Sequence, residues 1–108
     1  MGNNNEAKIE QLQLLEQNIQ ALLVQKQTFQ SQLLEIENSL EELKKVKERP
    51  YKIVGPIMVL SDKEELTTEL ENKKEVLDLR IKSIEKQEND TRERAKKLQE
   101  EVINTLRE

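Results

Sequence analysis

The sequence predicts a mainly α-helical chain, an antiparallel two-helix coiled coil whose helices are joined by a short β-hairpin. Charged residues make up 37% of the 108 residues and apolar residues 34%, a balance typical of long solvated helices. Three of the four Gly and Pro residues fall between Pro50 and Pro56, which confines the helix breakers to one central stretch. We expect a single elongated domain over 1–108, with helices at 6–48 and 62–106 around a hairpin at 51–60.

The first predicted helix carries a heptad seam, in which residues recur at alternating steps of three and four. Nine of its ten positions are apolar, and the exception is Lys26. Pro50 disfavours helical backbone at Arg49 and therefore ends this segment. The seam residues are Leu12, Leu15, Ile19, Leu22, Lys26, Phe29, Leu33, Ile36, Leu40 and Leu43.

The second predicted helix begins with a possible capping box, in which the Ser61 hydroxyl and the Glu64 carboxylate would satisfy free amides of the first turn. Its seam is weaker, because Lys74, Glu88 and Thr91 interrupt it. The apolar seam residues are Leu70, Leu77, Ile81, Ile84, Ala95, Leu98 and Val102.

Folding the two helices back about residues 55 and 56 brings Lys26 level with residues 84–88, and Glu88 is the polar seam position there. The sequence thus predicts a polar layer. In the interpretation that we favour, Lys26 and Glu88 fix the helix register at some cost in stability. The alternative is a flexible waist at which the helices bend.

The central stretch contains two β-prone runs, 51–54 and 57–60, on either side of Gly55-Pro56. A two-residue loop would place Tyr51, Ile53, Met58 and Leu60 on one face of the hairpin, and Lys52, Val54, Ile57 and Val59 on the other. Both faces are largely apolar, and an isolated two-stranded hairpin is marginal in water. We expect strands from other chains to cover it. The predicted assembly residues are Tyr51, Ile53, Val54, Ile57, Met58, Val59 and Leu60.

Near the two termini, the helices carry more apolar residues than one seam needs. These residues could complete ordinary packing between the helix ends, or they could form an adaptable apolar surface for partners. The candidate client-binding residues are Ile9, Leu12, Leu14, Leu15, Val102, Ile103 and Leu106.

Composition excludes several classes of function. Without His or Cys, the chain has no imidazole acid–base group, no thiolate nucleophile and no soft zinc ligands, and we expect no enzyme, metal or cofactor. A carboxylate-based hydrolase would need a dry pocket, which two thin helices do not provide. The net charge of −4 disfavours nucleic acid. No apolar run approaches the length needed to cross a membrane, so we expect a soluble cytoplasmic protein.

The sequence resembles the β-type subunit of prefoldin, as found in archaea, over nearly its whole length. The similarity lies in short segments whose order around one hairpin is characteristic. They are Val24-Gln25-Lys26-Gln27, Leu40-Glu41-Glu42-Leu43, Tyr51-Lys52-Ile53-Val54-Gly55, Glu65-Leu66 with Glu69-Leu70, and Leu79-Arg80 followed by Glu85-Lys86-Gln87-Glu88.

This resemblance implies a hexamer of two α-type and four β-type subunits, with the hairpins joined in a β-barrel hub. It also implies an ATP-independent holdase, which captures unfolded polypeptides at the coiled-coil tips and passes them to a group II chaperonin. The alternative is a structural coiled-coil adaptor, whose apolar tips dock one defined partner. Suppression of protein aggregation without ATP would separate the two.

Overall fold

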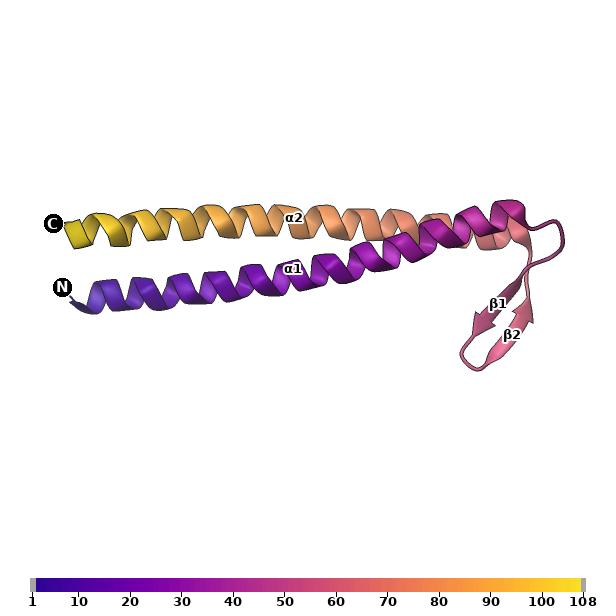
Figure 1. The fold of residues 1–108 in the computed structure, drawn as a ribbon, viewed down its shortest axis with the longest axis horizontal. Coiled ribbons are helices and arrows are strands. Elements are labelled where there is room, and N and C mark those ends of the chain that lie inside the picture. The colour runs from indigo at the N-terminus through magenta and orange to yellow at the C-terminus, as the bar shows by residue number, and fades with distance from the viewer. Residues whose placement is uncertain (1, 108) are drawn as a thin grey trace. The chain divides into compact units, whose positions relative to one another are not determined.

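Two long helices and a hairpin account for nearly all of the chain. The computed structural model describes residues 2–107, with side chains from residue 5 onward. The element order is α1 (Gly2–Lys45), β1 (Tyr51–Val54), β2 (Ile57–Leu60) and α2 (Lys63–Arg107), shown in Figure 1. The predicted fold class is therefore confirmed at the level of the chain. No helix within residues 2–107 combines the length and the apolar character needed to cross a bilayer.

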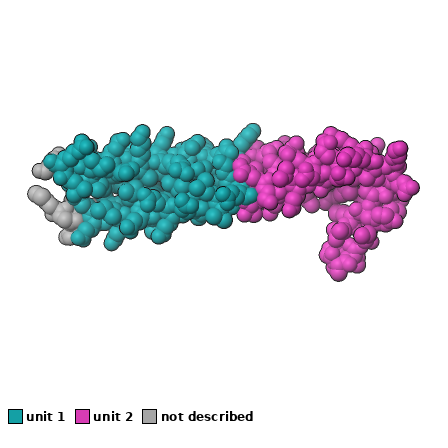
Figure 2. All heavy atoms as spheres, in the orientation of Figure 1, with its two compact units in different colours: residues 1–27, 82–108 teal, residues 28–81 magenta. Residues whose placement is uncertain are grey.

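The chain forms two compact units, coloured separately in Figure 2. Unit 1 contains the described residues up to Gln27 and those from Lys82 onward, and unit 2 contains residues 28–81. Both α1 and α2 continue through both units, because each helix crosses the boundary without a break. Each unit thus holds one segment of α1 and one of α2, and unit 2 also holds the hairpin.

In unit 1, the two helix segments pack through the predicted seam. Leu15, Ile19 and Ala95 form a buried cluster, and Leu12 and Leu98 pack against it together with Leu23. Each predicted seam position in this unit is buried or half-buried. This includes the interruptions at Glu88 and Thr91, so the heptad pattern is followed where the residue is polar as well as where it is apolar.

In unit 2, the seam continues in the same way from Phe29 to Leu43 on α1 and from Leu70 to Ile81 on α2. Leu43, Leu77 and Ile81 are buried, with exposed fractions of 6–8%. The Arg80 guanidinium lies 5.7 Å from the centroid of the Phe29 ring, within the range of a cation–π contact. This contact joins α2 to the single aromatic seam residue of α1.

Both helix boundaries beside the hairpin differ from those expected. Helix α1 ends at Lys45, three residues before the expected end at residue 48. The Val46 amide donates to the Leu43 carbonyl at 3.2 Å, a tightened last turn, and the chain then turns to bury Pro50. The prediction of a capping box at Ser61 is wrong, because the cap lies one residue later in the chain, at Asp62. Helix α2 begins at Lys63, and the Asp62 carboxylate accepts from the Glu64 amide at 2.9 Å.

The hairpin has the predicted two-residue loop. The cross-strand partners are Tyr51 with Leu60, Lys52 with Val59, Ile53 with Met58, and Val54 with Ile57. Because side chains alternate along a strand, the predicted division between the two faces follows from this register. Gly55 has a φ of +58°, which suits Gly at the first loop position of a type II′ turn and leaves Pro56 with its ordinary negative φ.

Candidate functional site

The hairpin exposes the whole set of predicted assembly residues. The exposed fractions are 64% for Tyr51, 72% for Ile53, 48% for Val54, 58% for Ile57, 67% for Met58, 43% for Val59 and 47% for Leu60. The sheet has two strands, so each strand also offers an unpaired edge. An apolar surface of this kind, with hydrogen-bonding groups along both edges, is suited to strand pairing with another chain.

Three hydrogen bonds to main-chain carbonyls fix the base of the hairpin. The Ser61 amide donates to the Pro50 carbonyl at 2.8 Å and closes the two strands at the helix side. The Arg49 guanidinium donates to the Ser61 carbonyl at 3.3 Å, and the Lys63 ammonium donates to the Val46 carbonyl at 3.1 Å. Each of these bonds joins the segment before the hairpin to the segment after it, so the base is held as one piece.

An ion pair attaches the hairpin to α2. The Lys52 ammonium donates to both carboxylate oxygens of Glu69 at 2.8 Å, and Lys73 lies 3.4 Å from one of these oxygens. Lys52 is the single charged side chain of the two strands, and its partner lies 17 residues away on the helix. This contact favours one orientation of the hairpin relative to α2 within unit 2.

The Lys52 hydrogen bond lowers the pKa of Glu69 below its usual 4.5 and outweighs the opposing effect of desolvation. Because the folded-state pKa is depressed, the pair stabilises the hairpin orientation above about pH 4.5, and the contribution is lost as the pH falls through the folded-state pKa. We expect Lys52→Gln to raise the pKa of Glu69 toward its usual value. Lys73→Gln, a matched control, should raise it less, because Lys52 is the dominant cause. A carbon-13 NMR titration of the Glu69 carboxyl checks both values, and equal shifts in the two variants would contradict this assignment.

The predicted client-binding residues, all in unit 1, fall into two groups. Leu15 and Val102 are buried at 8% exposure and Leu12 is half-buried, so these three pack between the helices. The other four are exposed: Ile9 and Ile103 at 41%, Leu14 at 60% and Leu106 at 72%.

Continuing the heptad count places Ile9, Ile103 and Leu106 on one side of the helix pair and Leu14 on the other. In the usual heptad letters, Leu12 and Val102 are a positions of the seam, and Leu15 and Leu98 are d positions. Ile9 and Leu106 each directly follow a d position, and Ile103 directly follows an a position. In an antiparallel pair these positions face the same side. The Lys8 to Glu101 ion pair, at 3.6 Å, joins the two helices at this level. We call Ile9, Ile103 and Leu106 the apolar end patch.

The predicted polar layer is present in unit 1. The Lys26 ammonium lies 3.7 Å from carboxylate oxygens of both Glu85 and Glu88. Glu88, whose side chain is only 12% exposed, is also bound by the Arg92 guanidinium at 3.0 Å. The two glutamates are thus matched by two cations, and Glu88 keeps a close partner in Arg92 that does not depend on Lys26.

Replacing Lys26 with Leu is therefore expected to raise the melting temperature without changing the assembly size. The substitution completes the apolar seam, whereas Glu88 remains paired with Arg92. Exchanging a poorly solvated ion pair for apolar packing is often stabilising by about 1 kcal/mol or more, equivalent to roughly 4–8 °C in a domain of this size. Thermal unfolding followed by circular dichroism measures the shift. Lys26→Ala is the control, because it removes the charge without filling the seam, and a lower melting temperature for Lys26→Leu would count against the polar-layer interpretation.

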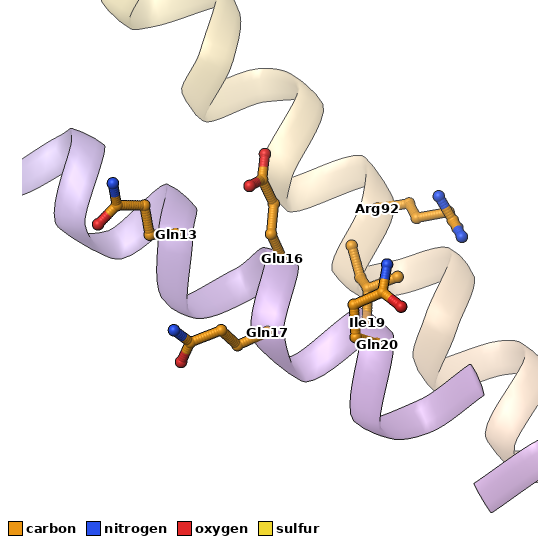
Figure 3. A pocket seen from close by; sticks show the side chains of 6 residues that line it. All are labelled: Gln13, Glu16, Gln17, Ile19, Gln20 and Arg92. Atoms are coloured by element: carbon orange, nitrogen blue, oxygen red, sulfur yellow. The ribbon is translucent and has the colours of Figure 1, made fainter. Parts of the chain in front are cut away.

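The surface beside this layer is polar. Figure 3 shows Gln13, Glu16, Gln17 and Gln20 extending from α1, with Arg92 on α2 and Ile19 between the helices. Ile19 is the one apolar residue lining this hollow, and it is buried at 7% exposure. The exposed apolar end patch therefore does not extend along this face.

Several features near these surfaces were not predicted from the sequence. Val24, Leu34, Val76 and Leu79 are exposed apolar residues away from the seam, at 48–61% exposure. The contact between Lys52 and Glu69 was also missed, because it joins two elements whose relative orientation is set by tertiary structure. The sequence does show that Lys52 is the one charged residue of the two strands, and this could have indicated that it has an acidic partner elsewhere in the chain.

The match to a family model, "Prefoldin subunit", spans residues 6–108. The chain belongs to the prefoldin family. This is a family of non-enzymatic chaperone co-factors. The resemblance to this family inferred from the sequence segments is thereby confirmed.

Several similar proteins are prefoldin β subunits of archaea, which confirms the predicted assignment to the β type. The chain is 40% identical over 100 residues to "Prefoldin subunit beta" of Archaeoglobus fulgidus, covering 91% of this chain and 86% of the relative. It is 36% identical over 104 residues to "Prefoldin subunit beta" of Thermococcus onnurineus, covering 94% and 90%. The crystal structure of the prefoldin beta subunit from Thermococcus strain KS-1 matches with a TM-score of 0.91 at 31% identity, covering 97% of this chain and 94% of the other.

Proposed function

We propose that the chain is the β-type subunit of a cytoplasmic prefoldin hexamer with two α-type and four β-type subunits. The hairpins join in a β-barrel hub, and residues 1–108 act as one domain. The observation that carries this proposal is the hairpin with seven exposed apolar side chains and two unpaired strand edges. Removing such a surface from water contributes roughly 25 cal/mol for each Å² of apolar area, and the entropy lost when the chains associate offsets part of this gain.

In this proposal, the assembly holds unfolded polypeptides without ATP and passes them to a group II chaperonin. The chain itself catalyses no reaction and uses no cofactor. Clients contact the apolar end patch and Leu14, whereas Leu12, Leu15 and Val102 support these residues from within the helix pair. Several such ends on one assembly bind a client more tightly than one end does, because the later contacts form at a high effective concentration.

The holding activity is tested by static light scattering of a protein that aggregates on dilution from denaturant. We expect the assembly to suppress aggregation at near-stoichiometric amounts with no nucleotide present. Addition of ATP should leave the suppression unchanged. An absence of suppression would instead support an adaptor that docks one defined partner.

A further inference from the structure

The two sides of the helix pair in unit 2 have different chemical character. One side has a hollow lined mainly by charged residues: Glu37, Glu41, Lys44, Lys63, Glu71 and Lys74, with Asn38, Leu40 and Thr67. The other side has a groove of about 480 Å³ next to the hairpin, lined by the apolar residues Leu43, Val46, Pro50, Leu66 and Leu70, with Tyr51 and Ile53 of β1 and the polar residues Asn38, Ser39, Glu42 and Lys52. We call this second hollow the hairpin groove.

The hairpin groove is formed before any partner binds. Its floor includes the buried residues Leu43 and Pro50. Its hairpin wall is positioned by the ion pair of Lys52 with Glu69, and by the bond between Ser61 and Pro50 at the hairpin base. A preformed groove of this kind loses little conformational entropy when it is filled.

The charges of the hairpin groove favour an uncharged occupant. Two of the residues that line it are charged, Glu42 and Lys52, and both have partners in the protomer: Lys45 at 3.4 Å and Glu69 at 2.8 Å. A charged segment entering the groove would therefore lose hydration without gaining a free counter-charge. An apolar segment would instead cover Leu66, Leu70 and the exposed side chain of Ile53.

The hairpin of this chain is itself an uncharged, apolar segment of the kind that the groove favours. The nine residues from Ile53 to Ser61 contain no charge, and β2 consists of four apolar residues with exposed fractions of 43–67%. The groove also runs directly into the hairpin surface, because Tyr51 and Ile53 belong to both. An occupant that pairs with the hairpin would thus reach the groove without leaving the contact.

We infer that the hairpin groove receives the hairpin of a second copy of this chain, with β2 as the inserted strand. The interface then includes the helix residues Leu66, Leu70 and Val46 in addition to the strands. This inference rests on the proposed assembly through the hairpins, and it adds a contact between the hairpin of one copy and the helix pair of another.

Site-directed cross-linking tests this contact, and because this chain has no Cys, the introduced thiols are the only ones on either copy of it. Ser39→Cys, in the groove, is placed on a tagged copy, and Met58→Cys or Ile57→Cys, in β2, on an untagged copy. The copies are assembled together with the α-type subunit and treated with a short thiol-to-thiol cross-linker. Glu41→Cys on the tagged copy is the matched control, because Glu41 lines the charged hollow on the other side. We expect at least tenfold more cross-linked heterodimer with Ser39→Cys than with Glu41→Cys.

A mass measurement of each mixture distinguishes a failure of the groove contact from a failure of the proposed assembly. An intact assembly without excess cross-linking from Ser39→Cys overturns the groove contact and leaves the proposed function standing. A mixture that stays monomeric overturns both. As a second readout, Ser39→Arg should raise the concentration at which the assembly dissociates about tenfold, whereas Glu41→Arg should change it less than twofold. Equal effects of the two arginines would contradict the inference.

Discussion

Placing one aspartate on each face of the hairpin, with Ile53→Asp and Val59→Asp, is expected to convert the assembly into free protomers with nearly full helix content. Both side chains are exposed in the protomer, at 72% and 43%, so the substitutions remove no protomer core. In the assembly, each carboxylate would be buried without a partner at a cost of several kcal/mol, which together weakens association by more than about 1,000-fold. Light scattering gives the mass, and circular dichroism gives the helix content.

The matched control carries the same two charges outside the hairpin, as Leu34→Asp and Leu79→Asp. These side chains have comparable exposure, at 59% and 61%, and lie on the helices of unit 2 away from the seam. The control should keep the mass of the unmodified assembly. An unchanged oligomer for the hairpin variant would refute the role assigned to the hairpin.

Replacing the apolar end patch with serine, in the triple variant of Ile9, Ile103 and Leu106, is expected to abolish most of the holding activity. Each substitution removes roughly 1 kcal/mol of apolar contact with a client, and the three together lower the affinity about a hundredfold. The assembly should keep its mass, because these residues lie in unit 1 and the hairpin lies in unit 2. The aggregation assay measures the loss.

The control for this variant removes the same number of exposed apolar side chains elsewhere, as Leu34→Ser, Val76→Ser and Leu79→Ser. It should suppress aggregation as well as the unmodified assembly does. If both triple variants lose activity equally, clients bind apolar surface in general, and the end patch has no special part.

The heptad pattern made the helices and their pairing predictable. Lys26, the polar residue of the first seam, lies beside Glu88 as the fold-back about residues 55 and 56 requires. The sequence left the exact hairpin register open, because it did not fix the length of the loop. For a two-residue loop it allowed one set of cross-strand partners, and the structure has that set, with Gly55 supplying the positive φ.

Features that depend on tertiary contacts were less predictable. The Ser61 cap was predicted from the spacing to Glu64, but Pro50 and Arg49 bind the Ser61 amide and carbonyl, and Asp62 caps the helix instead. The apolar residues near the termini divide according to the heptad seam and not according to composition. Leu14 and Leu15 are adjacent and equally apolar, but the helix turns one outward at 60% exposure and the other inward at 8%.

The hairpin also carries the single phenol of a chain that has no indole. Tyr51 is 64% exposed in the protomer, and its ultraviolet emission arises from this one position. Emission from the unlabelled chain therefore reports on the surroundings of one strand alone. A change in its intensity or in its quenching by iodide on mixing with other subunits would follow hub formation in real time, without an introduced dye.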